Sequence, residues 1–316
     1  MAVVSAPPIG GRDYPRTFRE LETWFPVEAA CLDYLARVRW SGGFVCPRCA
    51  ATEAWQLSRG LWRCASCRRE TSVTAGTIFA GTRQPLKLWF AAAWYVTNQK
   101  LGVSALGLQR ALGLGSYETA WAMLHKLRRA MVRPGRDRLA GEVEVDESYV
   151  GGVASGKRGR GAAKKAIAAI AVEQRGRGMG RVRLARVPDI TAASLEGFVG
   201  EAVEPAAVIY TDGYGGYAGL AACGYTHVPT AISDTGDPAH VVMPRVHLVA
   251  SLLKRWLLGT HQGAVRPQHL DDYLHEFAFR FNRRGSSHRG LLFYRLLEQA
   301  VQLEHVPLSA IVGGRL

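Results

Sequence analysis

Four of the six cysteines in this 316-residue chain form two Cys-x-x-Cys pairs, Cys46 with Cys49 and Cys64 with Cys67. Each pair places two thiols on one tight turn, and 14 residues separate the two pairs. Two such turns complete a tetrahedral Zn²⁺ site with no open coordination position, so the metal has a structural role. Disulfides or redox-active cysteines are the alternative, but paired cysteines in a reducing compartment usually bind metal. We therefore expect a zinc ribbon over residues 41–75.

Helical patterns surround the cysteines. Residues 1–40 form a lead-in with short amphipathic helices, and residues 83–133 form further helices, with Ser104 and Ser116 as N-caps on either side of a glycine turn at 113–115. A short helix, a turn with glycine and a second helix is the layout of a helix-turn-helix DNA-binding unit, although an ordinary helical bundle has the same pattern. The second helix ends in basic residues that suit contact with DNA phosphates, namely Lys126, Arg128 and Arg129.

Strand patterns begin after the Pro-Gly pair at 134–135 and indicate an α/β domain over residues 138–303, followed by a tail at 304–316. Strands are expected near 142–149, 166–173, 181–187, 206–212 and 225–232, and helices near 191–203, 244–258, 267–282 and 290–303.

Two of these strands carry an aspartate toward their carboxyl ends, Asp146 and Asp212. If the two strands are parallel neighbours, the carboxylates meet at one edge of the sheet, where they can hold a divalent metal for phosphodiester chemistry. Glu144 shares the face of Asp146 and could support it. The helix near 244–258 presents His247 and Lys254 on one face, two turns apart. A core or capping histidine and a solvated lysine are the alternatives.

The charge of the chain favours a nucleic-acid partner. Its formal net charge is +14 and its pI is about 9.9, and its basic residues occur in runs. The sequence has no long uncharged apolar stretch and no secretory signal pattern, so we expect a cytoplasmic protein without a membrane span. Further basic residues that we expect to contact DNA are Lys157 and Arg158 in a flexible loop, and Arg255, Arg283 and Arg284 on or near helices.

Four strings in the chain resemble zinc-ribbon DDE-type insertion-sequence transposases of the ISXO-like group. They are VDESYVGG at 145–152, TDGYGGY at 211–217, SLLKR at 251–255 and EFAFRFNRR at 276–284. The separations among Asp146, Asp212, His247 and Lys254 agree with the same resemblance. Together with the cysteine pairs it covers nearly the whole chain, roughly residues 17–303.

The resemblance implies a ribonuclease H-like catalytic domain that binds two Mg²⁺ ions between Asp146 and Asp212. It implies metal-dependent DNA strand cleavage and strand transfer, with water and then a freed 3′-hydroxyl as nucleophile. The implied partners are the terminal inverted repeats of the element and a target DNA, and holding two ends together implies a dimer or higher oligomer. Lys254 is expected to contact a phosphate near the scissile bond.

His247 departs from the family, most of which has Glu at this position. Imidazole suits Mn²⁺ better than Mg²⁺. The histidine could ligate the second ion, position water or phosphate, or mark an inactive copy. Two other functions stay open: a DNA-binding regulator that uses only residues 44–131 without catalysis, and a nuclease with the same fold but no joining step.

Overall fold

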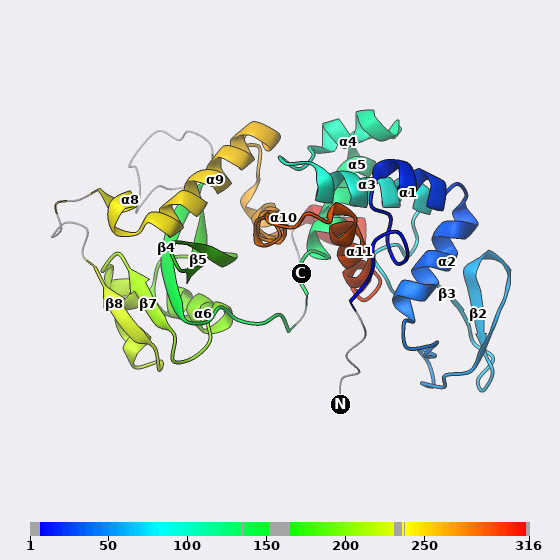
Figure 1. Cartoon of the computed structure of the whole chain (residues 1–316), viewed down its shortest axis with the longest axis horizontal. Coiled ribbons are helices and arrows are strands. Elements are labelled where there is room, and N and C mark those ends of the chain that lie inside the picture. Colours follow the sequence, from blue (N-terminus) through cyan, green and yellow to red (C-terminus); the bar gives the residue numbers. More distant parts are fainter. Residues whose placement is uncertain (1–6, 134, 152–164, 231–235, 237, 314–316) are drawn as a thin grey trace. The chain divides into compact units, whose positions relative to one another are not determined.

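The computed structural model describes residues 7–133, 135–151, 165–230, 236 and 238–313, and the ribbon is drawn in Figure 1. The chain divides into two compact units: the first comprises residues up to 133 together with 286–316, and the second comprises 134–285. The expected basic loop with Lys157 and Arg158 lies outside the described residues. No helix among the described residues is long and apolar enough to cross a membrane.

The first unit begins with two helices, α1 (Phe18–Trp24) and α2 (Glu28–Arg39). Thr17 caps α1, because its hydroxyl accepts the backbone N–H of Glu20 at 3.1 Å. The carboxylate of Glu20 in turn accepts the backbone N–H of Arg16, the residue before the cap, at 2.7 Å.

A small antiparallel sheet follows, with strand order β1-β2-β3. Its rear face packs on an aromatic cluster in which Trp62 stacks on Phe44, with ring centroids 5.9 Å apart, and lies 5.2 Å from Trp40. Trp55 lies on the other face of the sheet and is 48% exposed, so it is not part of this cluster. The strands are β1 (Ala54–Gln56), β2 (Leu61–Cys64) and β3 (Glu70–Ser72), with the short 3₁₀ helix η1 (Ser58–Gly60) before β2.

The helical part of the first unit agrees closely with the prediction. Ser104 and Ser116 cap their helices by accepting the backbone N–H groups of Gly107 and Thr119. Gly113 ends the first of these two helices with φ +62°, a left-handed conformation that glycine adopts without strain. The helices are α3 (Leu86–Asn98), α4 (Ala105–Leu112) and α5 (Tyr117–Arg129).

The helix α11 (Arg289–Ala300) completes the first unit, not the α/β domain that was expected to reach residue 303. Phe293 of α11 packs against Phe90 of α3, with centroids 5.7 Å apart. A Cβ on Gly290 would overlap the carbonyl oxygen of Pro15, so this helix start approaches the N-terminal segment as closely as glycine allows. The short helix α12 (Leu308–Gly313) follows.

The second unit contains a five-stranded mixed sheet in the order β6-β5-β4-β7-β8. Strands β4, β5 and β6, the first three of this unit, form an antiparallel meander, whereas β7 and β8 run parallel to β4. This arrangement confirms the α/β prediction. The strands are β4 (Glu142–Val150), β5 (Ala166–Arg175), β6 (Gly178–Val187), β7 (Val208–Thr211) and β8 (Thr226–Pro229).

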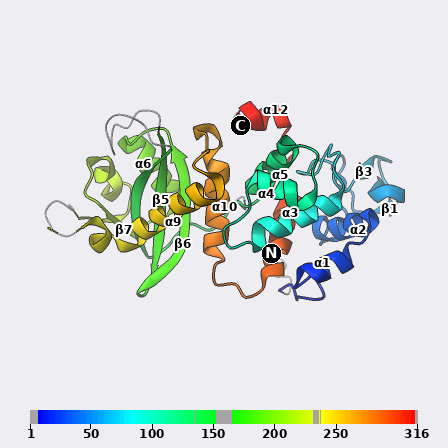
Figure 2. The ribbon, with the colours of Figure 1, turned by 90° about the horizontal axis from the view of Figure 1, so that it is seen from above.

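Helices supply the hydrophobic core on both faces of this sheet. One core joins β5 and β6 to α9 (Pro244–His261) and α10 (Leu270–Asn282). The other joins β4 and β7 to α6 (Ala192–Ala202) and the 3₁₀ helix η2 (Gly215–Ala221). Figure 2 shows α9 lying across the sheet and α10 beside strand β6. Short segments α8 (Ala239–Val242) and η3 (Pro267–His269) precede α9 and α10.

Side chains of α10 cover the outer edge of the sheet at β6. The Asn282 amide oxygen accepts the backbone N–H of Val182 at 2.7 Å, and its amide nitrogen donates to the Val182 carbonyl at 3.1 Å. Asp271 accepts the backbone N–H of Arg186 at 2.7 Å. These bonds satisfy backbone groups that an edge strand would otherwise expose.

Candidate active site

The register of β4 and β7 brings the two aspartates level with each other. The strands are parallel, and their last paired residues are Glu144 and Tyr210. Two residues further along each strand lie Asp146 and Asp212, on the same face because side chains alternate. The expectation of parallel neighbours is confirmed. The strand β4 continues four residues past Asp146 to Val150 while pairing with β5, close to the expected end near residue 149.

Local backbone groups orient both carboxylates. Asp146 Oδ1 accepts the N–H of Glu147 at 2.8 Å, and Asp212 Oδ1 accepts the N–H of Tyr214 at 3.0 Å. The turn after Asp212 requires Gly213, whose φ is +78°. Glu147 points to the opposite face of the sheet, where its carboxylate accepts a hydrogen bond from the Tyr217 hydroxyl at 3.1 Å.

His247 lies beside the first aspartate. Its Nδ1 is 3.8 Å from Oδ2 of Asp146, and the two side chains are 27% and 13% exposed. This distance is too long for a direct hydrogen bond, but the imidazole lies on the same face of the sheet as the Asp146 carboxylate. The sequence spacing therefore identified a residue that the fold places next to Asp146.

Glu144 fixes the start of the helix that carries His247. Its carboxylate accepts the backbone N–H groups of Arg245 and Val246, both at 2.8 Å, and the guanidinium of Arg245 at 2.9 Å. The residue at the N-cap position, Met243, contributes no side-chain cap. A buried carboxylate from the neighbouring strand therefore caps α9, where it also complements the helix dipole.

Arg245 extends this link to the β5–β6 turn. Its Nε donates to the carbonyl of Gly178 and its second terminal nitrogen donates to the carbonyl of Gly176, both at 3.1 Å. One guanidinium thus ties strand β4, helix α9 and the hairpin together. Sequence reasoning missed Arg245, although its position two residues before His247 is a usable signal.

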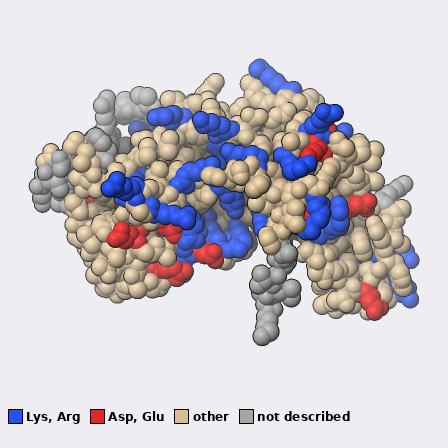
Figure 3. Space-filling model, in the orientation of Figure 1, with Lys and Arg blue, Asp and Glu red and all other residues tan. Residues whose placement is uncertain are grey.

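Lys254 lies on the exposed face of α9, seven residues after His247. The buried stripe of this helix comprises Val246, Val249, Ala250, Leu253, Trp256 and Leu257. Trp256 packs toward the core as expected, whereas Leu248 is 47% exposed. Leu248 is exposed because it falls outside the stripe set by the 3.6-residue period. Figure 3 shows Lys and Arg side chains spread over the side of the second unit that bears α9.

The two acids suit a hard divalent cation, since carboxylate oxygens are its preferred ligands. The candidate ligand atoms of Asp146, Asp212 and His247 do not all lie within 4.8 Å of one another, in contrast to the four cysteine sulfurs. The residues fit a divalent metal in type and in placement on one face.

The zinc ribbon meets a stricter geometric test. The sulfurs of Cys46, Cys49, Cys64 and Cys67 all lie within 4.8 Å of one another, with Cys46 to Cys67 and Cys49 to Cys64 each at 3.6 Å. A tetrahedron with Zn–S bonds of about 2.3 Å has sulfurs about 3.8 Å apart. Although burial raises it, hydrogen bonds from backbone N–H groups lower the pKa of the Cys46 thiol to about 6. Although a backbone hydrogen bond lowers it, hydrogen bonds with the other thiols raise the pKa of Cys49 to about 12. Cys46 is therefore the readier of the two to form a thiolate, and a bound Zn²⁺ would favour loss of the other protons.

The basic residues at the end of α5 are less accessible for contact with DNA phosphates than the sequence suggests. Arg128 is only 1% exposed, so the expectation that it lies on a phosphate-binding surface is wrong. Lys126 is half-buried and its ammonium donates to the carbonyl of Ile78 at 3.4 Å; burial lowers its pKa. Arg129 is also half-buried.

The basic residues of the second unit are better placed. Arg255 is exposed on α9. The guanidinium of Arg283 lies 3.9 Å from the ring centroid of Phe279, and that of Arg284 lies 4.2 Å from the centroid of Phe281. Aromatic contacts of this kind hold a cation in a fixed position.

Comparisons with known proteins agree with this division of the chain. Residues 138–282 match the ISXO2-like transposase domain, and residues 26–70 match the transposase zinc-ribbon domain. The chain is similar to an uncharacterized protein in transposable element ISH50 of Halobacterium salinarum. The identity is 29% over 281 residues, covering 81% of this chain and 91% of that protein. No solved structure matches the chain significantly.

Proposed function

Because this chain carries an ISXO2-like transposase domain behind a transposase zinc ribbon, we propose that it is a transposase that cuts and joins DNA at the ends of its insertion sequence. The observation that carries the proposal is the parallel register of β4 and β7, which brings Asp146 level with Asp212. The imidazole of His247, 3.8 Å from Asp146, supports it.

The strand order supports a ribonuclease H-like catalytic domain. An antiparallel meander of three strands is extended by two strands parallel to the first. Such a sheet places one acid on each of two adjacent central strands, and it leaves one face for the helix that carries His247. The helices α4 and α5 support a helix-turn-helix unit, although their buried basic end makes the exposed residues of the catalytic domain the stronger candidates for phosphate contact.

In the proposed reaction, Asp146 and Asp212 hold divalent metal, Mg²⁺ or Mn²⁺. The metal would supply activation of the attacking oxygen and stabilisation of the leaving 3′ oxygen. His247 completes the ligand set or orients the attacking group, and Glu144 keeps His247 over β4 by capping α9. Lys254 binds a phosphate beside the scissile bond. The four cysteines bind one structural Zn²⁺ in the ribbon.

The test uses full-length protein and DNA fragments taken from both sides of its gene. We expect wild-type protein to cleave at inverted repeats and to join a pre-cut end to target DNA. Asp146→Asn should keep DNA binding and lose cleavage and joining. Glu142→Gln is the matched control, because Glu142 lies exposed on the same strand and face and has no assigned role.

Each alternative function predicts a different result. Cleavage by wild-type protein without joining of pre-cut ends would identify a nuclease. DNA binding without any cleavage would identify a regulator or an inactive copy. Undiminished cleavage by Asp146→Asn would remove the proposed catalytic site altogether. Since transposition holds two ends at once, the active species is proposed to be a dimer or higher oligomer on DNA.

A further inference from the structure

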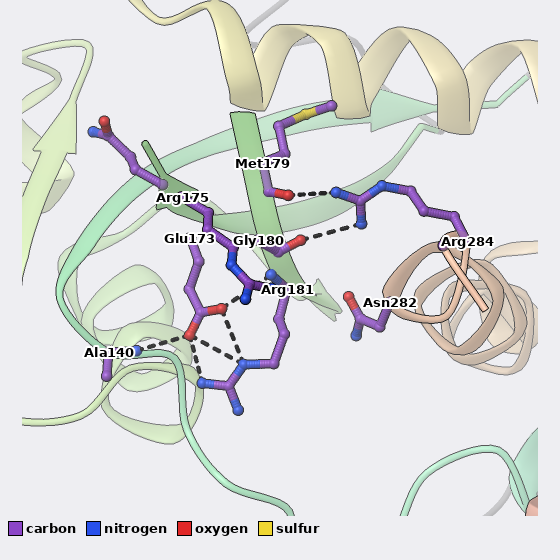
Figure 4. A pocket seen from close by; sticks show the side chains of 10 residues that line it. Ala140, Glu173, Arg175, Met179, Gly180, Arg181, Asn282 and Arg284 are labelled. Atoms are coloured by element: carbon purple, nitrogen blue, oxygen red, sulfur yellow. Dashed lines mark hydrogen bonds and ion pairs between the residues drawn. The ribbon is translucent and has the colours of Figure 1, made fainter. Parts of the chain in front are cut away.

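An open pocket of about 610 Å³ lies at the hairpin end of β5 and β6, with a lining that the catalytic proposal does not use. We call it the arginine pocket. Figure 4 shows Glu173 hydrogen-bonded directly to Arg181 in its lining, and Arg284 reaching toward the backbone of β6. The lining consists of guanidinium, carboxylate, amide and backbone groups with small or flexible side chains, and it contains no aromatic residue.

The single carboxylate of the arginine pocket is already saturated. Glu173 accepts hydrogen bonds from the Arg181 guanidinium, with Nε at 3.0 and 3.1 Å from its two oxygens, and from the backbone N–H groups of Ala140 and Arg181 at 3.1 and 3.0 Å. Burial raises the pKa of Glu173, but these bonds outweigh burial and lower it. One negative charge is therefore matched by one arginine.

Two further arginines add positive charge without an acidic partner in the pocket. The guanidinium of Arg284 donates to the carbonyls of Gly180, at 3.2 Å, and Met179. These are neutral acceptors. The Arg175 side chain is exposed and, among the described residues, has no hydrogen bond or ion pair. With three arginines and one glutamate, the lining of the pocket has a net charge of +2.

Neighbouring residues show that positive charge is crowded in this part of the second unit. Burial and, after it, the like charges of Arg136 and Arg181 together lower the pKa of Arg183 to about 10. The hydrogen bonds that the Arg183 guanidinium makes within the described part of the chain go to two backbone carbonyls, those of Val182 and Asp137. An anion bound nearby would relieve this repulsion.

We propose that the arginine pocket binds phosphate groups of a DNA strand that also reaches the catalytic site. The inference rests on the proposed function for the identity of the polyanion. Glu173 pairs with Val143 of β4, three residues before Asp146, which is about 10 Å along the strand. The side chains of Glu173 and Asp146 leave the sheet on opposite faces, so one DNA strand would contact both sites by passing around the hairpin end of the sheet. Guanidinium groups suit phosphodiester oxygens, and a lining without aromatic rings offers no surface on which a base could stack.

The test compares two arginines of the same hairpin. Arg175 lines the arginine pocket, whereas Arg177, two residues away and also exposed, does not. Affinity of the full-length protein for an end-containing duplex is measured by fluorescence anisotropy at several salt concentrations. We expect Arg175→Ala to weaken binding and to reduce the slope of log affinity against log salt by about 0.9, the value for one phosphate contact. Arg177→Ala should change both much less.

Equal losses of DNA affinity in the two variants would overturn the proposal, because the total charge of the hairpin and not the pocket would then determine binding. No loss in either variant would overturn it as well, because neither arginine would then contact DNA. Thermal unfolding of each variant distinguishes a folding defect from the loss of a DNA contact. Arg175→Gln provides a second variant, with an uncharged side chain that is closer in length to arginine. Inorganic phosphate at matched ionic strength tests for a small-anion site. If it stabilises wild-type protein saturably and Arg175→Ala abolishes this without changing DNA affinity, the assignment to DNA is overturned.

The proposal and the proposed function can fail independently. Wild-type protein that does not bind its ends at all would contradict the transposase proposal. Wild-type protein that binds and cleaves, with Arg175→Ala equal to wild type in affinity and salt slope, would contradict only the arginine pocket.

Discussion

The link between Glu144 and helix α9 leads to a quantitative prediction about stability. The Glu144 side chain is 3% exposed and its ion-pair partner Arg245 is 18% exposed. Glu144→Ala removes a helix cap, which costs about 1 kcal/mol, and leaves a largely buried guanidinium without its carboxylate, which costs about 3–5 kcal/mol. Because both effects come from one group they do not add, and we expect a loss of about 3–5 kcal/mol in the free energy of unfolding.

Two further variants separate charge from packing. Glu144→Gln keeps an oxygen for the backbone N–H groups but loses the charged hydrogen bond to Arg245, so a loss of about 1.5–3 kcal/mol is expected. Glu142→Gln is the control, since its carboxylate is exposed and contacts only the Tyr210 hydroxyl at 3.5 Å among the described residues. A change within about 0.5 kcal/mol is expected there.

The assay must report on the second unit within the full chain. Trp256 is the single tryptophan of residues 134–285, and its side chain is buried on the core-facing side of α9. Fluorine NMR of fluorotryptophan-labelled protein, with Trp256→Phe to assign its signal, follows unfolding in guanidinium chloride. If Glu144→Ala shifts the Trp256 transition no more than Glu142→Gln does, the carboxylate does not hold α9 and the reasoning is refuted.

Four other changes have expected outcomes. His247→Glu should shift the metal preference of strand cleavage from Mn²⁺ toward Mg²⁺, and an unchanged ratio of rates with the two ions would count against a ligand role. Cys64→Ser should lower bound zinc from one per chain to a small fraction, as measured by elemental analysis, and should unfold the ribbon. Gly290→Ala should destabilise the first unit by about 1–3 kcal/mol in thermal unfolding through steric overlap, whereas the helical control Gly197→Ala, with nothing within 4 Å of its added Cβ, should be neutral or stabilising. Because folding lowers the pKa of Glu173, its carboxylate contributes fully to the free energy of unfolding above its ordinary pKa of 4.5, and this contribution is lost as the pH falls through the lowered value. Glu173→Gln should therefore flatten the dependence of the free energy of unfolding on pH in that acidic range, and leave the dependence near neutral pH unchanged.

The regular elements could be predicted from sequence because their local signals and their packing agree. The hydroxyl caps at Ser104 and Ser116 mark helix starts wherever the chain is folded, and the alternation from residue 142 onward marks a half-buried strand. The cysteine spacing predicts the ribbon because four thiolates around one ion leave few geometries. The aspartates could be paired from sequence because parallel strands align their carboxyl ends.

Tertiary contacts decided the features that could not be predicted. Arg128 carries the same charge as an exposed arginine, so its burial has no local signature. Leu248 is apolar but lies outside the buried stripe of α9, and a single exposed leucine is common on protein surfaces. Helix α11 was assigned to the α/β domain by its position in the chain, whereas Phe293 finds its aromatic partners in the first unit.

The side chains that α10 places along β6 limit how copies of this protein can assemble. Asn282 bonds to both the backbone N–H and the backbone carbonyl of Val182, and Asp271 bonds to the backbone N–H of Arg186. A strand from a second molecule cannot pair with this edge while those bonds persist, so a sheet shared between protomers across β6 is blocked. Any protomer that brings a second DNA end alongside the first must therefore dock through a different surface, and an interface search can begin by excluding this one.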